Sequence, residues 1–321
     1  MQVPFAPVIE APTHLKGRHF LRVADWSTHE LVTIIELALD LKRLQRARTP
    51  HALLPNRTLA MIFDKPSTRT RVSFAAGMVQ LGGVGLPITT SEMQLGRGEP
   101  LRDTALVLSR LVDGLVIRTF RQSDVEELAA HSTIPVINGL TDDFHPCQAI
   151  ADALTITEHF GAFRGVRLAY VGDGNNVCHS LMTICARLGV GFVAATPPGY
   201  EPRGDVVDVA RAAAKEHRTA LELVSNPREA VRDANVVYTD VWTSMGQDEE
   251  AEQRRRAFAG YRVDDELLAN APDDALVMHD LPAHYDEEIT EAVLHGPRSL
   301  AWDQAENRLH AQKALLALVM R

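Results

Sequence analysis

The sequence predicts an α/β protein with two domains, each a parallel sheet flanked by helices and joined by interdomain helices. The chain has 321 residues, which suits two domains because single domains mostly run to roughly 100–200 residues. From about residue 57, short β-branched or aliphatic runs alternate with longer helical patterns, as in parallel α/β layers. These runs form two groups, separated by a helical pattern from His145 to about Phe160.

The individual elements follow in chain order. Ser27 can cap a first helix, and Glu30 can close a capping box three residues later. A last helix is expected from Asp303 to Met320. The first domain is expected over residues 1–144, with the C-terminal helix 303–321 packing back on it, and the second over residues 145–302. The expected strands are Thr58–Phe63, Leu115–Arg118, Pro135–Asn138, Arg167–Val171, Gly191–Ala195, Leu221–Val224, Val236–Asp240 and Leu276–His279.

Composition excludes several classes of function. The formal net charge is −9, and no run of Lys and Arg forms the basic surface that nucleic-acid binding needs. The cysteines Cys147, Cys178 and Cys185 form no Cys-x-x-Cys pair, so neither disulfides nor structural zinc are expected. No leader-like N-terminus is visible, and no segment reaches about 18 uncharged apolar residues. We therefore expect a cytoplasmic protein that binds neither membrane nor nucleic acid.

The segment Phe63–Arg71 joins a predicted strand to a predicted helix. Arg69 and Arg71 lie in the first helical turn, where the helix dipole disfavours each cation by a few tenths to about 1 kcal/mol. A bound anion would explain these positions, because free N–H groups, hydroxyls and a guanidinium can surround a phosphate. The hydroxyls are those of Ser67, Thr68 and Thr70. The alternative is an ordinary Ser-capped helix with surface arginines.

A second motif, His145-Pro-Cys-Gln148, follows the strand Pro135–Asn138. Proline at the first helical position places His145 at the cap and Gln148 one turn later, so both can face one ligand. An imidazole and a carboxamide suit a small carbonyl or amide group. Arg118 ends another strand, and open α/β sheets bind ligands at the carboxyl ends of their strands. A capping histidine with a solvated glutamine is the alternative.

Three segments leave the strands of the second domain at their carboxyl ends: Gly172–Asn176, Asp240–Gly246 and His279–Pro282. Asp240 could bind an ammonium group. Asn176 could bind a carboxylate or amine, and Ser244 with the Met245 backbone could complete an amino-acid site. Taken singly, the segments are ordinary turns and caps.

Gly172 and Gly174 also suggest dinucleotide binding. The dinucleotide-binding motif Gly-x-Gly-x-x-Gly, however, requires a small residue at position 177, where this chain has Val177. A nucleotide-dependent oxidoreductase is therefore a secondary alternative.

Together these motifs resemble the aspartate/ornithine carbamoyltransferase family, and within it the ornithine branch. The resemblance runs from His14-Leu-Lys-Gly17 to Glu306-Asn-Arg-Leu-His-Ala-Gln312. Ser67-Thr-Arg-Thr70 and His145-Pro-Cys-Gln148 resemble the carbamoyl-phosphate motifs, and Asp240-x-x-x-Ser-Met-Gly246 resembles the ornithine-specific loop.

The resemblance implies transfer of the carbamoyl group of carbamoyl phosphate to the δ-amine of L-ornithine, in arginine metabolism. It implies no metal or organic cofactor, and a homotrimer with shared sites. The first domain would bind carbamoyl phosphate and the second ornithine. The matching carbamoyl-phosphate positions are Ser67, Thr68, Arg69, Thr70, Gln94, Arg118, His145, Pro146, Cys147, Gln148, Asp280, Leu281 and Arg308, and the matching ornithine positions are Asn176, Asp240, Ser244 and Met245. Among these, Arg118, His145, Asp240 and Asp280 are the expected catalytic residues.

One position departs from the family pattern. The family usually reads His-Cys-Leu-Pro, whereas this chain has Asp280 in place of the cysteine. Its carboxylate bears on proton transfer at the reacting amine. The departure leaves two alternatives: a carbamoyltransferase for another amine, such as putrescine or an acylated ornithine, and a catalytically silent paralogue.

Overall fold

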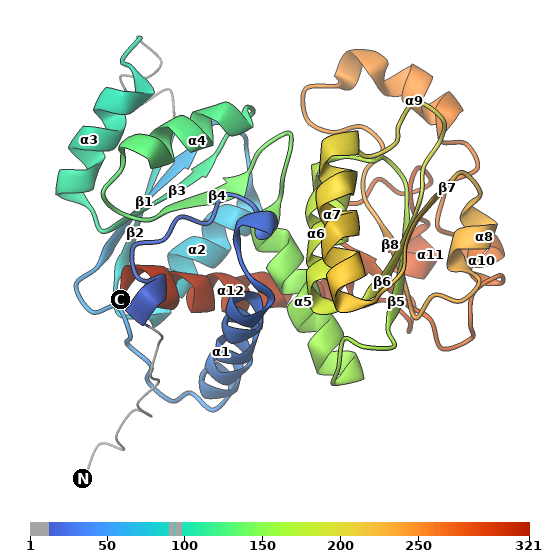
Figure 1. The fold of residues 1–321 in the computed structure, drawn as a ribbon, viewed down its shortest axis with the longest axis horizontal. Helices are drawn as coiled ribbons and strands as arrows, with labels where there is room; N and C mark the ends of the chain where they lie inside the picture. Colours follow the sequence, from blue (N-terminus) through green and yellow to red (C-terminus); the bar gives the residue numbers. More distant parts are fainter. Residues whose placement is uncertain (1–12, 90–92, 94–97) are drawn as a thin grey trace. The chain divides into compact units, whose positions relative to one another are not determined.

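The structure is a computed structural model, and it describes residues 13–89, 93 and 98–321 (Figure 1). The contacts of the chain divide it into two compact units. Unit 1 runs to Leu154 and resumes at Asn307–Arg321, and unit 2 is Thr155–Glu306. Within the described ranges, no helix is both long and apolar enough to cross a membrane.

Unit 1 contains a parallel sheet whose described strands lie in the order β2-β1-β3-β4. The strands are β1 (Thr58–Phe63), β2 (Val84–Thr89), β3 (Gly114–Arg118) and β4 (Val136–Leu140). The helices are α1 (Thr28–Arg46), α2 (Thr68–Gln80), α3 (Leu101–Leu111) and α4 (Gln122–His131), preceded by the short 3-10 helices η1 (Thr13–Leu15) and η2 (Val23–Asp25). Figure 1 shows α3 and α4 on one face of the sheet and α2 on the other.

Unit 2 contains a second parallel sheet, with the order β7-β6-β5-β8-β9 among its described strands. The strands are β5 (Arg167–Val171), β6 (Gly191–Ala195), β7 (Leu221–Val224), β8 (Val236–Thr239) and β9 (Leu276–His279). The helices are α6 (Asn176–Leu188), α7 (Gly204–His217), α8 (Pro227–Val231), η5 (Asp248–Glu250), α9 (Ala251–Ala257), α10 (Asp265–Leu268) and α11 (Glu291–Leu294). Figure 1 shows α6 and α7 side by side on one face and α8, α10 and α11 on the opposite face.

In each sheet, successive strands are added first toward one edge and then toward the other, and the place where this direction changes is where ligands can bind. In unit 1 the chain passes from β1 outward to β2 and from β3 outward to β4, so the reversal lies between β1 and β3. In unit 2 it lies between β5 and β8 for the same reason. The loops at the carboxyl ends of such neighbouring strands diverge to opposite faces and leave a crevice, the usual ligand site of open α/β sheets.

Two long helices, α5 (Pro146–Phe160) and α12 (Ala301–Met320), belong partly to each unit. The sequence placed the domain boundary at 144/145, whereas the contacts divide inside α5, after Leu154. The first turns of α5 contact unit 1: the Cys147 thiol bonds the Asn138 carbonyl, and Gln148 bonds Arg308. For α12, membership of unit 1 begins at Asn307 and not at the expected residue 303.

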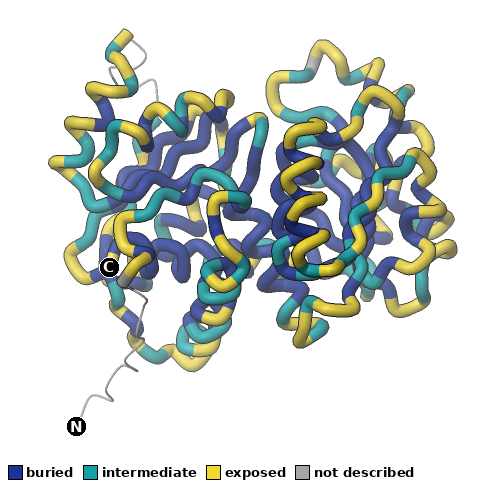
Figure 2. Tube along the Cα trace, viewed as in Figure 1, coloured by how far each residue is buried: buried dark blue, intermediate teal, exposed yellow. Residues whose placement is uncertain are grey.

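Burial follows the layers (Figure 2). β3 and β4 are buried along their whole length, while the edge strand β2 is exposed at several positions. Fully burying an aliphatic or aromatic side chain stabilises a fold by about 1.5–3 kcal/mol, so β3 and β4 anchor unit 1. Helix α12 is buried from Ala311 to Met320, including the charged residue Lys313. The Nζ of Lys313 lies 3.0 Å from His51 Nε2 and donates a hydrogen bond to Gln80 Oε1 at 2.9 Å.

The predicted fold class is confirmed, and all eight expected strands are present with ends shifted by at most two residues. The capping box of Ser27 and Glu30 is also confirmed. The strand β2 was not predicted from the sequence. This strand contains Gly85 and Pro87 and has a mostly exposed edge, so it shows neither an uninterrupted apolar run nor a clear alternation.

Candidate functional site

The first cluster of candidate residues begins at the N-terminus of α2, beside the reversal between β1 and β3. Ser67 caps α2, and its hydroxyl accepts a hydrogen bond from Thr70 N at 3.1 Å. Arg69 lies half-buried in the first turn. Its Nε is buried without a hydrogen-bond partner among the residues that the structure describes. A cation thus lies at the positive end of the helix dipole, which favours an anionic ligand there.

Thr70 is the centre of this cluster. Its hydroxyl oxygen accepts a hydrogen bond from Arg308 Nη2 at 2.6 Å and lies 3.4 Å from Arg118 Nη1. Thr70 is fully buried, and both arginines are more than nine-tenths buried. The cluster joins α2, the end of β3 and α12, three segments far apart in the sequence. Two buried guanidinium groups within reach of one hydroxyl form a strongly positive site, as a phosphate or a developing oxyanion requires.

Helix α5 orients the polar side chains on the same site. Arg308 Nη1 donates to Gln148 Oε1 at 3.0 Å, and Gln148 Nε2 donates to Asp152 Oδ1 at 2.8 Å. Asp152 therefore fixes which end of the Gln148 amide faces Arg308. Pro146 is the first residue of α5, so His145 lies just before the helix as predicted.

The positive cluster sets the protonation of its neighbours. Burial lowers the pKa of His145 well below its usual value, and the charges of Arg308, Arg118 and Arg69 lower it further. The imidazole is consequently neutral at neutral pH. Burial also raises the pKa of the Cys147 thiol to about 12. Since the thiolate is the reactive form, Cys147 has a structural role, with its Sγ 3.3 Å from the Asn138 carbonyl oxygen.

Lys65, the third cation near the start of α2, is not part of this cluster. Its side chain is buried, pairs with Asp142 and lies 4.4 Å from the centre of the Phe120 ring. The loop before α5 therefore neutralises Lys65, and the arginines carry the positive charge of the site.

The second cluster lies in unit 2, where β5 and β8 diverge. Asn175 caps α6, because its Oδ1 accepts hydrogen bonds from Val177 N at 3.0 Å and Cys178 N at 3.1 Å. Its Nδ2 donates to Asp240 Oδ2 at 2.7 Å. The sequence predicts Asn176 as a residue that binds the acceptor. Its side chain is buried, and its Oδ1 accepts a hydrogen bond from Val177 N. The bond from Asn175 to Asp240 was not predicted, because two adjacent asparagines give no sequence signal for which of them makes it.

Asp240 and Asp280 form a pair of buried carboxyl groups. They are 5 % and 8 % exposed, and their oxygens lie within 4.8 Å of one another and of His279. Burial raises the pKa of Asp240 well above its ordinary value, and the charge of Asp280 and a hydrogen bond between the two side chains raise it further. The closeness of the two carboxyl groups therefore favours uptake of a proton by the pair.

His279 holds the turn that carries Asp280. Its Nδ1 accepts a hydrogen bond from Leu281 N at 2.9 Å, and its Nε2 lies 3.1 Å from Oε1 of the fully buried Glu288. Leu281 has a φ of 62°, a left-handed conformation that L-residues seldom adopt and that this bond stabilises. Because both ring nitrogens are engaged, a metal ion bound by Asp240 and Asp280 would have to break one of these contacts to gain His279 as a ligand.

Ser244 and Met245 lie in the loop between β8 and η5. Ser244 N donates to Gln247 Oε1 at 2.9 Å, and Gln247 N donates to Ser244 O at 3.0 Å, so the two residues close a tight turn. Met245 is about half exposed. Gln94, the remaining predicted site residue, lies outside the described residues.

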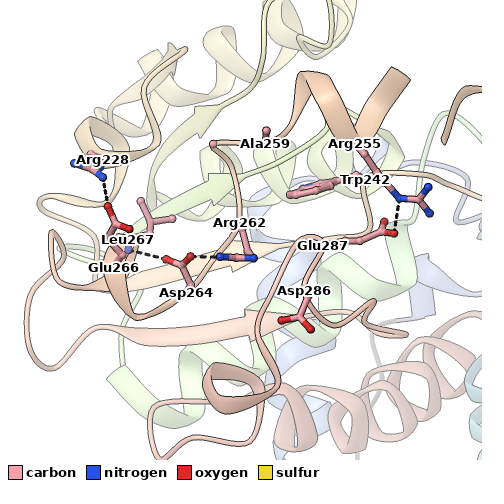
Figure 3. Close-up of a pocket in the computed structure, with 11 residues that line it drawn as sticks. Arg228, Trp242, Arg255, Ala259, Arg262, Asp264, Glu266, Leu267, Asp286 and Glu287 are labelled. Atoms are coloured by element: carbon pink, nitrogen blue, oxygen red, sulfur yellow. Dashed lines mark hydrogen bonds and ion pairs between the residues drawn. The ribbon is translucent and has the colours of Figure 1, made fainter. Parts of the chain in front are cut away.

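A separate hollow of about 500 Å³ in unit 2 is lined mainly by charged side chains (Figure 3). Its three arginines each face a carboxylate: Arg228 pairs with Glu266, Arg255 with Glu287, and Arg262 with Asp264. All six side chains are partly exposed, so these pairs contribute little to stability. The hollow thus pairs each arginine with a carboxylate, whereas the arginines around Thr70 converge on one hydroxyl group.

Two domain families match the chain. Residues 18–158 match the carbamoyl-P binding domain of aspartate/ornithine carbamoyltransferase, and residues 164–319 match the Asp/Orn binding domain of the same enzymes. Together they span most of the chain.

Relatives and solved structures agree with this match. A protein of Pyrococcus horikoshii named ornithine carbamoyltransferase is 52 % identical over 306 residues, which are 95 % of this chain and 96 % of the relative. One of Pyrococcus furiosus, named as the anabolic ornithine carbamoyltransferase, is 53 % identical over 95 % of this chain and 97 % of its own length.

The structure of the ornithine carbamoyltransferase from Pyrococcus furiosus matches with a TM-score of 0.93 at 52 % identity, covering 97 % of this chain and 99 % of the other. That from Thermus thermophilus matches with a TM-score of 0.84 at 40 % identity, covering 94 % and 98 %. The match of both domains over nearly the whole length shows that this chain belongs to the aspartate/ornithine carbamoyltransferase family.

Proposed function

We propose that this enzyme transfers the carbamoyl group of carbamoyl phosphate to the δ-amine of L-ornithine, giving L-citrulline and phosphate in arginine synthesis. The observation that carries the proposal is the positive cluster of unit 1. Arg118 and Arg308 converge on Thr70, with Arg69 at the start of the same helix and a neutral His145 beside them. Such a cluster fits a small dianion that also bears a carbonyl group.

In the proposed mechanism, unit 1 binds carbamoyl phosphate. Ser67, Thr68 and the free N–H groups of α2 bind the phosphate together with Arg69. Arg118, His145 and Thr70 donate hydrogen bonds to the carbonyl oxygen as it becomes an oxyanion. His145 serves as a neutral donor because its pKa is lowered, and a neutral donor adds no positive charge to a site that already holds three arginines. Phosphate then leaves, stabilised by Arg69.

Unit 2 binds the acceptor. The buried carboxyl groups of Asp240 and Asp280 attract an ammonium group, and Asn175 holds Asp240 in place. Ser244 and Met245 complete the amino-acid site from the loop that follows β8, with Asn176 at the start of α6. The δ-amine attacks the carbonyl carbon in its neutral form and forms the C–N bond. The C–O bond to phosphate then breaks, and the departing phosphate takes the proton that the nitrogen loses. Positioning and electrostatics account for the acceleration, so no covalent intermediate with the protein is required.

We further propose a cytoplasmic homotrimer in which Gln94 of one copy completes the site of its neighbour. Unit 1 has a surface suited to a second copy of the chain. Val72 and Val79 on α2 and Val84 and Leu86 on the edge strand β2 are apolar, and each is 43 to 70 % exposed. Apolar side chains gathered at an unpaired sheet edge favour association.

An acceptor panel tests the proposed reaction. Purified protein is supplied with carbamoyl phosphate and with ornithine, putrescine or an N-acylated ornithine, and the carbamoylated products are quantified. The proposal predicts a kcat/KM for ornithine far above that for the other amines, because Asp240 and the loop with Ser244 are suited to a free α-amino acid. A preference for putrescine or the acylated amine would assign another acceptor, and no product from any amine would reject the transferase function.

A further inference from the structure

Arg254, in α9, lies at the junction of three segments of unit 2. Its Nη1 donates to Asp173 Oδ2 at 2.8 Å and to the Trp242 carbonyl oxygen at 3.0 Å. Its Nε donates to Glu250 Oε2 at 3.1 Å. The side chain is only 6 % exposed. A guanidinium buried at this depth is held by its hydrogen bonds, and its three acceptors come from different segments.

The Asp173 contact ties Arg254 to the turn that follows β5. This turn also contains Asn175, which bonds Asp240. The turn is fixed from the other side as well, because Gly174 N donates to Tyr200 O at 2.9 Å. A Cβ at position 174 would lie 2.3 Å from Pro202 N, so the backbones are in direct contact. Asp173 is therefore a rigid anchor.

The Trp242 contact ties the same guanidinium to the loop between β8 and η5. Trp242 lies two residues after Asp240 and two before Ser244. Its ring is 5 % exposed and stacks on Phe258 with the ring centres 5.7 Å apart. The bond to its carbonyl oxygen fixes the backbone where the loop leaves the buried strand, whereas Met245, further along, is about half exposed.

Lysine could make only part of these contacts. The planar guanidinium presents donors in fixed, different directions, which suits a carboxylate, a carbonyl and a second carboxylate at once, whereas an ammonium is a single charge on a flexible stem. Tyr200 also favours arginine at this position, because its ring centre lies 5.1 Å from the Arg254 guanidinium carbon and a planar guanidinium can stack on an aromatic ring. Burial raises the pKa of Asp173 to about 6, and the charge of Arg254 opposes this rise. The ion pair is consequently intact at pH 7 and above.

We propose that Arg254 is a positioning residue for the acceptor: by bonding Asp173 and the Trp242 carbonyl, it holds the loop with Ser244 and Met245 in register with Asp240. The inference rests on the proposed function, since it assumes that this loop binds ornithine. It makes a selective prediction. Loss of Arg254 impairs acceptor binding and leaves carbamoyl phosphate binding intact, because its hydrogen bonds hold segments of unit 2.

The test compares Arg254→Gln and Arg254→Lys with Arg256→Gln in the same helix. Arg256 is the matched control because its side chain is 79 % exposed and pairs with Glu252 one turn away. Arg254→Gln should raise the KM for ornithine about 10- to 100-fold, the equivalent of one or two charge-assisted hydrogen bonds. The KM for carbamoyl phosphate should change less than about 2-fold. Arg254→Lys should recover part of the loss, and Arg256→Gln should match the wild type.

Two results would overturn the inference: an unchanged ornithine KM in Arg254→Gln, or an equal loss of affinity for both substrates. If Arg254→Gln does not fold, Arg254→Lys and Asp173→Asn carry the same test, with a smaller rise that is still confined to ornithine. The proposed function is tested separately by the wild type. A wild type that makes no citrulline rejects that function. An active wild type, together with an Arg254→Gln variant whose KM for ornithine is unchanged, rejects only this inference.

Discussion

The pair of Asp240 and Asp280 strengthens proton binding in the folded protein, because the pKa of Asp240 is raised there. Both side chains are buried, with carboxylate oxygens within 4.8 Å. Two full charges at that distance repel by at least about 3.5 kcal/mol at an effective dielectric constant of about 20. Burial is the largest cause of the raised pKa of Asp240, and the charge of Asp280 raises this pKa further. Replacing Asp280 by Asn removes the repulsion and leaves burial as the remaining cause.

The sign of the effect follows from proton linkage. A carboxyl with a raised folded-state pKa contributes stability below its unfolded pKa of about 3.9, and that stability is lost as the pH rises toward the folded value. Through this window the free energy of unfolding of the wild type falls by up to about 1.4 kcal/mol per pH unit because of this pair. Asp280→Asn should show a smaller slope, because only burial still raises the pKa of Asp240, so the variant gains stability over the wild type as the pH rises.

Urea unfolding of both proteins from pH 5 to pH 8, followed by circular dichroism, measures the difference in slope. A gain of 1 kcal/mol corresponds to about 2–4 °C in melting temperature for 150–250 residues, so thermal unfolding gives an independent check. Curves for the two proteins that stay parallel across this range would refute the contribution of Asp280 to the raised pKa of Asp240. The kinetic counterpart is Asp280→Cys. Its pH–rate profile at saturating ornithine should lie on the acid side of the wild-type profile, because Asp280 stabilises the unreactive ammonium form of the acceptor.

The remaining predictions concern the phosphate site, the assembly and one packed turn. Arg69→Ala should lower kcat/KM for carbamoyl phosphate by roughly 100- to 1,000-fold with an unchanged melting temperature, and an unaffected kcat/KM would remove Arg69 from the site. Mixing Gln94→Ala and Arg69→Ala subunits should restore about one quarter of the sites in random trimers, whereas no recovery after proven subunit exchange would contradict shared sites. Gly174→Ala should cost roughly 1–3 kcal/mol of stability because its Cβ meets the backbone of Pro202, while Gly204→Ala, with no atom within 4 Å, should be tolerated.

Elements with strong local signals could be predicted from the sequence. The strands β1, β5, β6, β7 and β9 match the expected bounds, because buried parallel strands are short, continuous apolar runs between turn residues. The cap at Ser27 has its own three-residue signature. The division into units was less predictable. Helix α5 continues without a break through the boundary, and contacts between residues distant in sequence decide to which unit each turn belongs.

The candidate site was predictable where a motif contains its own geometry. Pro146 at the helix start placed His145 and Gln148, and the cations at the start of α2 pointed to an anion. Tertiary contacts were not predictable in the same way. Nothing in the sequence shows that Asp142 neutralises Lys65 or that Arg254 reaches Trp242, because these pairs bring together segments that are adjacent only after folding.

The most direct test of the proposed reaction follows the transferred group itself. The wild-type protein and its Arg69→Ala variant, matched for melting temperature, are each incubated with carbamoyl phosphate carrying a ¹³C label in the carbamoyl group and with ornithine. Mass spectrometry then measures labelled citrulline beside released phosphate. For the wild type we predict one labelled citrulline for each phosphate, and for the variant a loss of both products together. Phosphate released without labelled citrulline, or equal yields from the two proteins, would contradict the proposed transfer and its site.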